Sequence, residues 1–215
     1  IDRPAIMIHV PADHPNHMVR LLDVGANVDS TAEQLVQFAI MGSVVAHAVG
    51  HIEQPRVALL NIGEEIIKGN EQVKKTAALL TENGIVNYVG FAEGNDIFRD
   101  VADVVVCDGF AGNIALKASE GTARLAMKFS REQFTKNFYA MFAALIARPV
   151  LISIKKRVSP ATHNGGSFLG LRGIVVKSHG GARAKAFISA VERAIWEAEN
   201  NVIDRIEEKI ADLLG

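Results

Sequence analysis

Residues 101–117, VADVVVCDGFAGNIALK, pass from a run of β-branched residues through a short polar loop into helix-compatible residues. An uninterrupted apolar run is typical of a strand that is buried on both faces of a parallel sheet. Ligands collect at the strand-to-helix loops of such sheets, because unpaired backbone N–H groups and the helix dipole favour an anion. Asp108, Asn113 and Lys117 are therefore candidate binding residues, and Gly112 would let the backbone approach the ligand. The alternative is that Asp108 and Asn113 only cap the helix.

The same succession of strand, polar loop and helix occurs twice earlier in the chain. Strands are predicted over residues 5–10 and 17–23, as a hairpin, and over 56–60 and 86–89; helices are predicted after an N-cap at Asp29 or Ser30 and over 71–81. Strands that alternate with helices predict an α/β fold of three layers, αβα, with a mainly parallel sheet. The polar loops 23–29, 61–70 and 108–113 would then share one edge of that sheet.

A long apolar stretch follows residue 121. Residues 138–154 are strongly apolar, are interrupted by an Arg-Pro pair at 148–149, and end in three basic residues. The stretch is too broken and too short for a membrane span, which needs ~20 apolar residues. Two interpretations stay open: an apolar helix pair in a membrane interface with anionic head groups, or a helix pair packed in the core or in a dimer interface. Composition alone favours the packed pair.

Glycines crowd residues 163–181, around a short predicted strand at 173–177. Such density lets the backbone come close to an extended ligand. Gly166 is one of these glycines, and Asn164, Lys177 and His179 would supply anion-binding or proton-transfer groups. The alternative is loose turns with a solvated lysine. The last segment, 181–214, is predicted to be one long helix with an apolar stripe.

Composition excludes several functions. A net charge of −1, from 23 Lys and Arg against 24 Asp and Glu, provides no basic field for nucleic acid. The sequence has no zinc-ligand spacing, no Gly-x-Ser-x-Gly elbow, no Walker loop and no dinucleotide fingerprint, so neither a metal nor a cofactor is expected. The single cysteine, Cys107, cannot form an intramolecular disulfide, which fits a reducing cytoplasm. Cys107 is either a buried neutral thiol or a thioester nucleophile.

Five blocks of the sequence carry a family resemblance: LLDVGANVD (21–29), VQFAIMGS (36–43), PRVALLNIGEEIIKGNE (55–71), ADVVVCDGFAGNIALKASEG (102–121) and NGGSFLGLRGIVVKSHGGA (164–182). Together they resemble the PlsX phosphate acyltransferases of bacterial phospholipid synthesis. The resemblance implies a fold like those of isocitrate and isopropylmalate dehydrogenases and of phosphotransacetylases, with residues 1–215 as one catalytic domain and an apolar helical protrusion at about 134–158. The family's N-terminal Gly-Gly-Asp and Gly-Asn-Thr-Gly motifs do not occur here, so we expect this chain to be the C-terminal two-thirds of such a protein.

The resemblance also implies a reaction, the transfer of a fatty acyl group from acyl-carrier protein to inorganic phosphate without a cofactor. Phosphate is itself a nucleophile and the carrier thiolate leaves readily, so placement and charge stabilisation would carry the rate. Lys68 would bind phosphate or neutralise developing charge, and Asn113 would donate to the phosphate or to the thioester oxygen. The other residues implied to shape the substrate site are Asn27, Asp29, Asn61, Gly63, Glu64, Asp108, Gly112, Lys117, Asn164, Gly166, Lys177 and His179.

The same resemblance favours a peripheral membrane contact for the apolar stretch, through Phe138, Phe142, Leu145 and Leu151. The expected partners are acyl-carrier protein, inorganic phosphate, a second copy in a homodimer, and a membrane glycerol-3-phosphate acyltransferase; the expected location is cytoplasmic and peripherally membrane-associated. Two other function classes stay open. One is a phosphate acetyl- or butyryltransferase that uses coenzyme A, or a dehydrogenase of the same fold. The other is a non-catalytic fragment that binds carrier protein or membrane.

Overall fold

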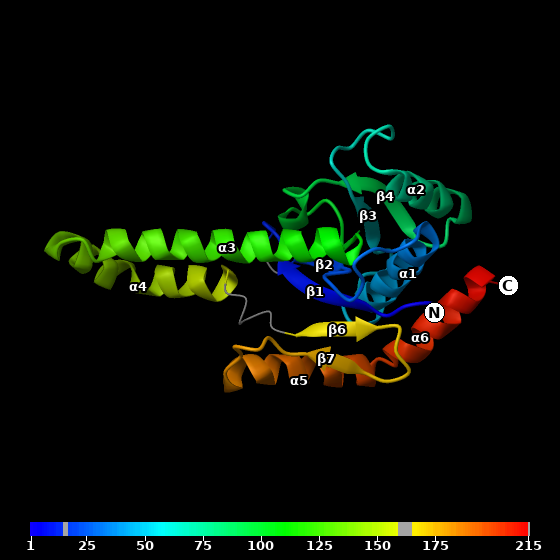
Figure 1. Cartoon of the computed structure of the whole chain (residues 1–215). Helices are drawn as coiled ribbons and strands as arrows, with labels where there is room; N and C mark the ends of the chain where they lie inside the picture. The colour runs from blue at the N-terminus through cyan, green and yellow to red at the C-terminus, as the bar shows by residue number, and fades with distance from the viewer. Residues whose placement is uncertain (15–16, 159–164, 215) are drawn as a thin grey trace.

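A seven-stranded sheet in the order β4-β3-β5-β2-β1-β6-β7 forms the centre of the molecule (Figure 1). The structure, a computed structural model, describes residues 1–14, 17–158 and 165–214. Strands β4, β3, β5 and β2 are parallel to one another, whereas β1, β6 and β7 join in antiparallel orientation. The strands are β1 (Ala5–Pro11), β2 (Met18–Leu22), β3 (Arg56–Leu60), β4 (Asn87–Ala92), β5 (Val104–Val106), β6 (Gly166–Leu169) and β7 (Val175–Lys177). The predicted α/β class is confirmed, and the parallel part of the sheet comprises four strands.

One face of the sheet is covered by α1 (Ala32–Ala48) and α6 (Val202–Leu214). Side chains alternate between the two faces of a strand, so Met7 and Leu22 point to this side and pack in the core that both helices share. The helix α2 (Glu71–Asn83) packs along α1. Because α1 contacts the sheet on one side and two helices on others, it is apolar almost all round rather than amphipathic.

The opposite face carries a second core. Leu21 and Val105 point to this side and pack with residues of the first turns of α3 (Gly109–Phe134) and of the short helix η1 (Asp96–Phe98). The remainder of α3 extends beyond the sheet and leaves part of this face uncovered by helix (Figure 1). Helices on both faces give the predicted three layers, with one layer thinner than the other.

The start of α1 differs from the prediction by one or two residues. Thr31 is the N-cap: its hydroxyl accepts a hydrogen bond from Gln34 N at 3.3 Å, and the Gln34 side chain accepts one from Thr31 N at 2.9 Å. This reciprocal capping box satisfies two backbone donors, so the predicted N-cap at Asp29 or Ser30 is wrong. The Ser30 carbonyl instead accepts a hydrogen bond from Gln72 and connects α1 to α2.

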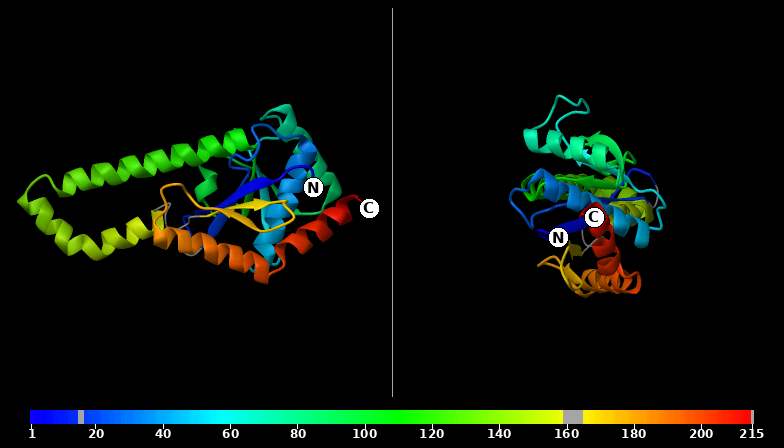
Figure 2. Two further views of the ribbon diagram at one scale, coloured as in Figure 1. Left: turned by 60° about the horizontal axis from the view of Figure 1, so that its bottom comes forward. Right: turned by 90° about the vertical axis from the view of Figure 1, so that its right-hand side faces the viewer.

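Helices α3 and α4 (Phe138–Val158) form an antiparallel hairpin that projects from the sheet (Figures 1 and 2). The predicted interruption at the Arg-Pro pair is wrong, because α4 continues through Pro149. Residues 138–157 are long and apolar enough to cross a membrane by length and composition, a criterion that core helices of soluble proteins also meet, and none of that window is buried. The hairpin therefore leaves many of its apolar side chains exposed.

The predicted single C-terminal helix is two helices, α5 (Ala184–Glu199) and α6. Asn201, between them, has a positive φ of 50°, a conformation that asparagine tolerates better than most residues and that ends a regular helix. The break directs α6 back along the face that carries α1, while α5 lies beside β7 (Figure 1). One uninterrupted helix could not contact both parts of the sheet.

Candidate active site

Three polar segments follow the parallel strands at one edge of the sheet. In the ladder, Leu22 of β2 is paired with Val106 of β5, which in turn is paired with Leu59 of β3. All three strands therefore end at the same level. The segments 23–29 and 61–70, and the start of α3, lie at this edge, where ligands bind in open α/β sheets.

Asp23 organises the first of these segments. Its Oδ1 accepts hydrogen bonds from the backbone N–H groups of Ile6, Gly25 and Ala26 at 2.9–3.0 Å, and its Oδ2 accepts from Asn27 N at 2.8 Å. The side chain is completely buried, and these charge-assisted bonds compensate for its loss of hydration. The sequence analysis did not single out Asp23 as a site residue. Its position directly after a buried strand, before a glycine, was the available signal.

Asn27 belongs to the same network. Its Nδ2 donates to Pro4 O at 2.8 Å and to Asp23 Oδ2 at 3.0 Å, so both amide hydrogens are used within the protein. Asp29 lies exposed near the end of the segment. The structure thus gives Asn27 a part in holding the loop, and its predicted contact with substrate stays a prediction.

The helix α3 begins earlier than predicted, at Gly109, so residues 109–113 are its first turns rather than a loop. Asp108 is the N-cap, and its Oδ1 accepts a hydrogen bond from Ala111 N at 2.8 Å. A Cβ on Gly109 would lie 1.9 Å from Asn27 O. The glycine at this position therefore allows close packing of α3 against segment 23–29, and not only the approach of a ligand.

Cys107 is buried beneath this helix start. Its Sγ donates a hydrogen bond to Asp23 O at 3.4 Å, and no substrate-sized cavity among the described residues is lined by it. Burial raises the pKa of the Cys107 thiol well above its usual range, and the nearby carboxylates of Asp108 and Asp23 act in the same direction. The thiol is therefore neutral near pH 7, which favours the buried structural role over a nucleophilic one.

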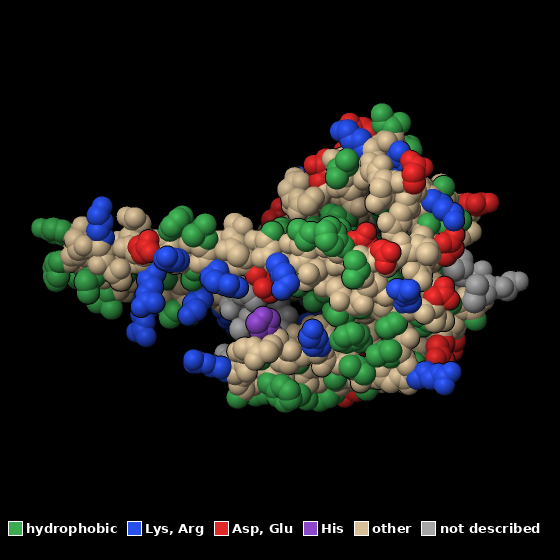
Figure 3. Space-filling view, in the orientation of Figure 1, with side chains coloured by type: hydrophobic (Ala, Val, Ile, Leu, Met, Phe, Trp, Pro, Cys, Tyr) green, Lys and Arg blue, Asp and Glu red, His purple; other side chains and the backbone are tan. Residues whose placement is uncertain are grey.

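A groove of about 1010 Å³ runs between β1, the first half of α3, the end of β7 and η1; we name it the β1–α3 groove. Five of the predicted site residues line it: Asn113, Lys117, Gly166, Lys177 and His179. Its apolar lining comprises Ile6, Ile8, Val10, Leu21, Val24, Ile97, Phe98, Ala115, Leu116 and Ala123. Lys and Arg side chains lie on both sides of the hollow below α3 (Figure 3). An apolar floor with cationic groups beside it suits a ligand that has an anionic head and an apolar body.

The β3–α2 segment does not line this groove. Asn61 Nδ2 donates to Gly63 O at 3.0 Å and to Lys68 O at 3.2 Å, which holds the segment in its turn. Lys68 Nζ lies 2.9 Å from Glu65 Oε1, and this hydrogen bond raises the pKa of Lys68. Glu64 is exposed beside them. The structure brings together Asn113, Lys117, Lys177 and His179, but not Lys68.

Asn164 lies outside the described residues. Gly166, two residues further, is buried in β6, where a Cβ would lie 3.0 Å from Ile6 Cγ2. Glycine at this position lets β6 lie close to the apolar floor of the groove. His179 follows β7, and its Nδ1 accepts a hydrogen bond from Gly181 N at 3.1 Å, so the neutral ring carries its hydrogen on Nε2.

Among the described residues, one group has the donor atoms for a metal: His17, Asp100 and Asp103. Arg56 already occupies both carboxylates, through Nη2 to Asp100 Oδ1 at 2.5 Å and Nε to Asp103 Oδ2 at 3.1 Å. The group lies where β3 and β5 begin, at the edge opposite to the polar segments. The group is therefore an ion-pair network that connects the starts of β3 and β5, and it lies away from the β1–α3 groove.

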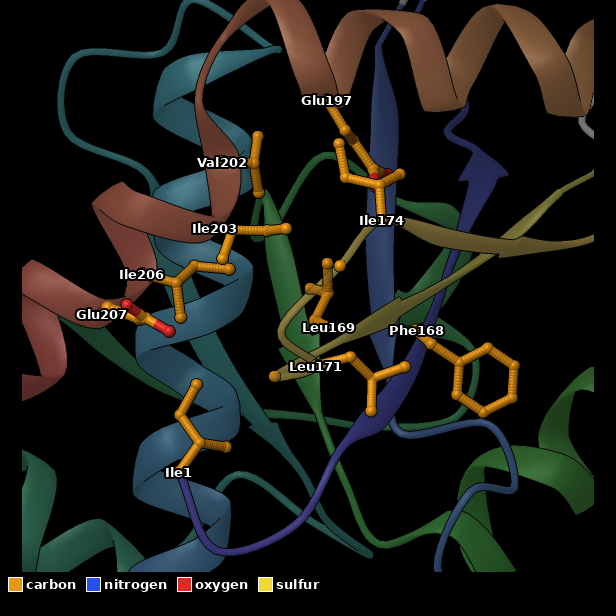
Figure 4. A pocket seen from close by; sticks show the side chains of 12 residues that line it. Ile1, Phe168, Leu169, Leu171, Ile174, Glu197, Val202, Ile203, Ile206 and Glu207 are labelled. Atoms are coloured by element: carbon orange, nitrogen blue, oxygen red, sulfur yellow. The ribbon is translucent and has the colours of Figure 1, made fainter.

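A second cavity, between β6 and the last two helices, has a volume of about 10 Å³. Ile1, Leu169 and Ile206 point into it, with Glu197 at its rim (Figure 4). A space of this size holds about one water molecule. It is a packing gap and offers no room for a substrate.

Comparison with known proteins gives the family. The profile of the family described as "Fatty acid synthesis protein" matches residues 1–205. The chain is 54% identical over 215 residues to a phosphate acyltransferase of Alkalilimnicola ehrlichii, and 51% identical over 214 residues to one of Coxiella burnetii. In both cases the alignment covers 100% of this chain and 62% of the relative, so the chain spans about 62% of the length of these curated relatives.

Among solved structures, a EutD phosphotransacetylase from Staphylococcus aureus matches 57% of this chain and 43% of its own, with a TM-score of 0.47 and 15% identity. The sequence match, in contrast, extends over nearly the whole chain and includes every segment that lines the groove. The chain therefore belongs to the family of fatty acid synthesis proteins that includes the PlsX phosphate acyltransferases.

Proposed function

We propose that this chain provides the acyl and phosphate site of an enzyme that transfers a fatty acyl group from acyl-carrier protein to inorganic phosphate. The observation that carries the proposal is the β1–α3 groove, in which an apolar floor adjoins Asn113, Lys117, Lys177 and His179. The relatives of this chain are named phosphate acyltransferases, which supports the same reaction class. The acyl phosphate product would feed phospholipid synthesis.

The reaction needs no nucleophile from the protein. A phosphate oxygen attacks the thioester carbonyl, the C–S bond breaks, and the phosphate proton passes to the sulfur, so acyl phosphate and free carrier thiol are formed. The protein has to hold two anions together and to stabilise the oxyanion of the tetrahedral intermediate. Hydrogen-bond donors and lysines serve both purposes, and they line the groove.

Each residue has a defined part in this proposal. Asn113, in the first turns of α3, donates to the thioester oxygen, and Lys117 lies one turn later on the same face of the helix, where it binds phosphate. Lys177 brings a second positive charge from β7. His179, with its hydrogen on Nε2, donates this proton to the departing sulfur and recovers one from phosphate.

Lys68 keeps its predicted role only if the substrate reaches the β3–α2 segment. It is half exposed and paired with Glu65, at the same edge of the sheet as Asn113 but outside the groove lining. A phosphate bound beside Lys68 would have to replace the Glu65 carboxylate. Among the described residues, no carboxylate forms an ion pair with Lys117 or Lys177 that would compete with phosphate.

The α3–α4 hairpin would place the enzyme on the membrane. Phe138 is 78% exposed, and Phe142 and Leu145 are also exposed, whereas Leu151 is half-buried and fits a membrane contact less well. Tyr139, which the sequence analysis did not select, is the most exposed aromatic of the tip. A peripheral contact through these side chains would bring the acyl phosphate close to a membrane glycerol-3-phosphate acyltransferase.

A homodimer is the other assembly we propose. The outer face of α5 exposes Phe187, Ile188, Ile195 and Trp196, and exposed apolar side chains that gather on one face mark an interaction surface. A second copy could cover this face without covering the hairpin. Sedimentation analysis of the wild type and of Ile188→Glu would test it, because the dimer should dissociate in the variant.

The test of the reaction is phosphate-dependent release of thiol from palmitoyl-acyl-carrier protein. The chain should be assayed alone and joined to the remaining portion of the Alkalilimnicola ehrlichii relative. The proposal is supported if either the chain alone or the joined protein shows turnover that requires phosphate. Turnover with acetyl-coenzyme A only would support the short-chain enzyme instead. Tight carrier binding without turnover in both forms would support the non-catalytic module.

A further inference from the structure

The β1–α3 groove has two distinguishable ends. At one end, Val24 N donates to Ile6 O at 3.1 Å, which ties the start of β1 to segment 23–29 near Asn113. From there β1 and α3 run in the same direction along the groove, to Ala12 on the strand side and Ala123 on the helix side. At ~3.3 Å per strand residue and ~1.5 Å per helix residue, these two walls are roughly 15–20 Å long.

A side chain from α4 crosses the far end. Arg157 Nη2 donates to Ala12 O at 3.2 Å and to Asp13 O at 3.3 Å, and all three residues line the groove. Arg157 is the last of three basic residues near the end of α4, where this helix returns from the hairpin towards the sheet (Figure 2). The hairpin is thereby connected to β1 at the point where the apolar floor ends.

We propose that the Arg157 bridge and the small side chain of Ala123 form the closed end of the groove and set the longest acyl chain that the enzyme accepts. The inference rests on the proposed function, in which the reacting carbonyl lies at Asn113 and the chain extends along β1. Each methylene that is buried against the floor improves binding roughly fourfold. A chain that passes Ala123 must instead displace a hydrogen-bonded guanidinium, so the gain stops there.

The first experiment measures kcat/KM for acyl-carrier proteins loaded with decanoyl to eicosanoyl chains. Arg157→Ala should raise the value for the octadecanoyl chain relative to palmitoyl by roughly tenfold, because each of its two additional methylenes contributes about fourfold. Arg148→Ala is the matched control: it removes the same side chain from an exposed position of the same helix that does not line the groove. Its length profile should equal that of the wild type.

The second experiment shortens the groove. Ala123→Val and Ala123→Phe should move the preferred length stepwise towards shorter chains, by more for the larger side chain. Displacement of a fluorescent fatty acid by free fatty acids of the same lengths gives a readout that does not depend on turnover. Unchanged length profiles in all variants, with folding verified by circular dichroism, would overturn the inference while leaving the proposed reaction intact. Chain-length discrimination in binding without any turnover would instead count against the reaction alone.

Discussion

Gly112 lies so close to Asp23 that a Cβ on the glycine would be 1.9 Å from the Asp23 backbone oxygen. The same Cβ would be 2.8 Å from Cys107 Sγ. The Asp23 oxygen cannot move freely, because it belongs to the backbone and because the Asp23 side chain is held by its own hydrogen bonds. The Cys107 sulfur is itself hydrogen-bonded to the same oxygen. The first turns of α3 therefore reach the edge of the sheet only with glycine at this position.

Gly112→Ala should consequently destabilise the protein by ~2–3 kcal/mol, the range of a methyl group forced into a packed interior. Urea unfolding followed by circular dichroism measures the change. Gly121→Ala in the same helix is the control, since nothing lies within 4 Å of a Cβ there and alanine favours helix over glycine. Its stability should be unchanged or higher. If the two variants had the same free energy of unfolding, the close packing of α3 against Asp23 would be contradicted.

Asn113→Ala and Lys117→Ala should each lower kcat/KM for acyl phosphate formation by about 10²–10³, the usual effect of losing one donor to a developing oxyanion or phosphate. Lys68→Ala should cost much less if the reaction takes place in the β1–α3 groove, because Lys68 does not line it. Steady-state kinetics on the three variants separates the sites. A larger loss for Lys68 than for Lys117 would move the phosphate to the β3–α2 segment.

Cys107→Ala should retain near wild-type turnover, because the buried thiol makes no contact with the groove and its pKa is raised by burial. Alkylation by iodoacetamide should be slow in the folded protein and fast in urea. Mass spectrometry of the labelled chain measures both rates. An acyl-enzyme thioester trapped on Cys107 during turnover would show that the thiol is a nucleophile after all.

The Arg56 network should make stability depend on pH. Hydrogen bonding from Arg56 lowers the pKa of Asp100; burial raises the pKa of Asp103, but the Arg56 hydrogen bonds outweigh it, so this pKa is lowered too. Carboxyls with lowered pKa contribute stability that is complete above their ordinary value of 3.8 and is lost as the pH falls through the lowered values.

Arg56→Gln should therefore cost on the order of 2 kcal/mol at pH 7, where it removes the guanidinium from the buried Asp103 carboxylate and leaves His17 as the remaining side-chain partner. The difference from the wild type should shrink at pH 3, where the carboxyl can protonate. Urea unfolding at both pH values tests this. Lys74→Gln, which removes an exposed ion pair with Glu71, should leave stability unchanged at either pH. If Arg56→Gln lowered the free energy of unfolding by the same amount at pH 7 and pH 3, the dependence of stability on the Asp103 carboxylate would be excluded.

The sequence predicted the elements whose patterns are local. An uninterrupted β-branched run gave β5, and the Arg56–Leu60 strand has its predicted bounds. The N-cap of α1 was misplaced because Ser30 and Thr31 both have side chains that can cap, and only the contact of Ser30 with α2 distinguishes them. The break at Asn201 was missed because an apolar stripe continues on both sides of it.

The candidate site was predicted in part for a similar reason. Polar residues at strand ends predicted that the three polar segments share one edge of the sheet, and they do, because the parallel strands before them end at one level. Which of these residues point into a cavity depends on tertiary packing, so Asn27 and Asn61 were grouped with Asn113 although their amides hold the backbone. Asp23 was passed over because its position after a buried strand is a weak signal, and the four backbone N–H groups that enclose its carboxylate come together only in the fold.

The exposed apolar tip of the hairpin carries the last prediction. Phe138, Phe142 and Leu145 are each more than half exposed. Replacing all three with Glu should abolish sedimentation with vesicles of anionic phospholipid, because it removes the apolar contact and adds negative charge next to the head groups. The hairpin projects from the sheet, so turnover of soluble acyl-carrier protein should change less than twofold (Figure 1). The control is a triple variant with Thr81→Glu and Asn83→Glu at the end of α2 and Gln54→Glu before β3, which adds three exposed charges away from the hairpin. Vesicle binding that survives in the hairpin variant would place the membrane contact on another surface, of which the apolar face of α5 is the next to test.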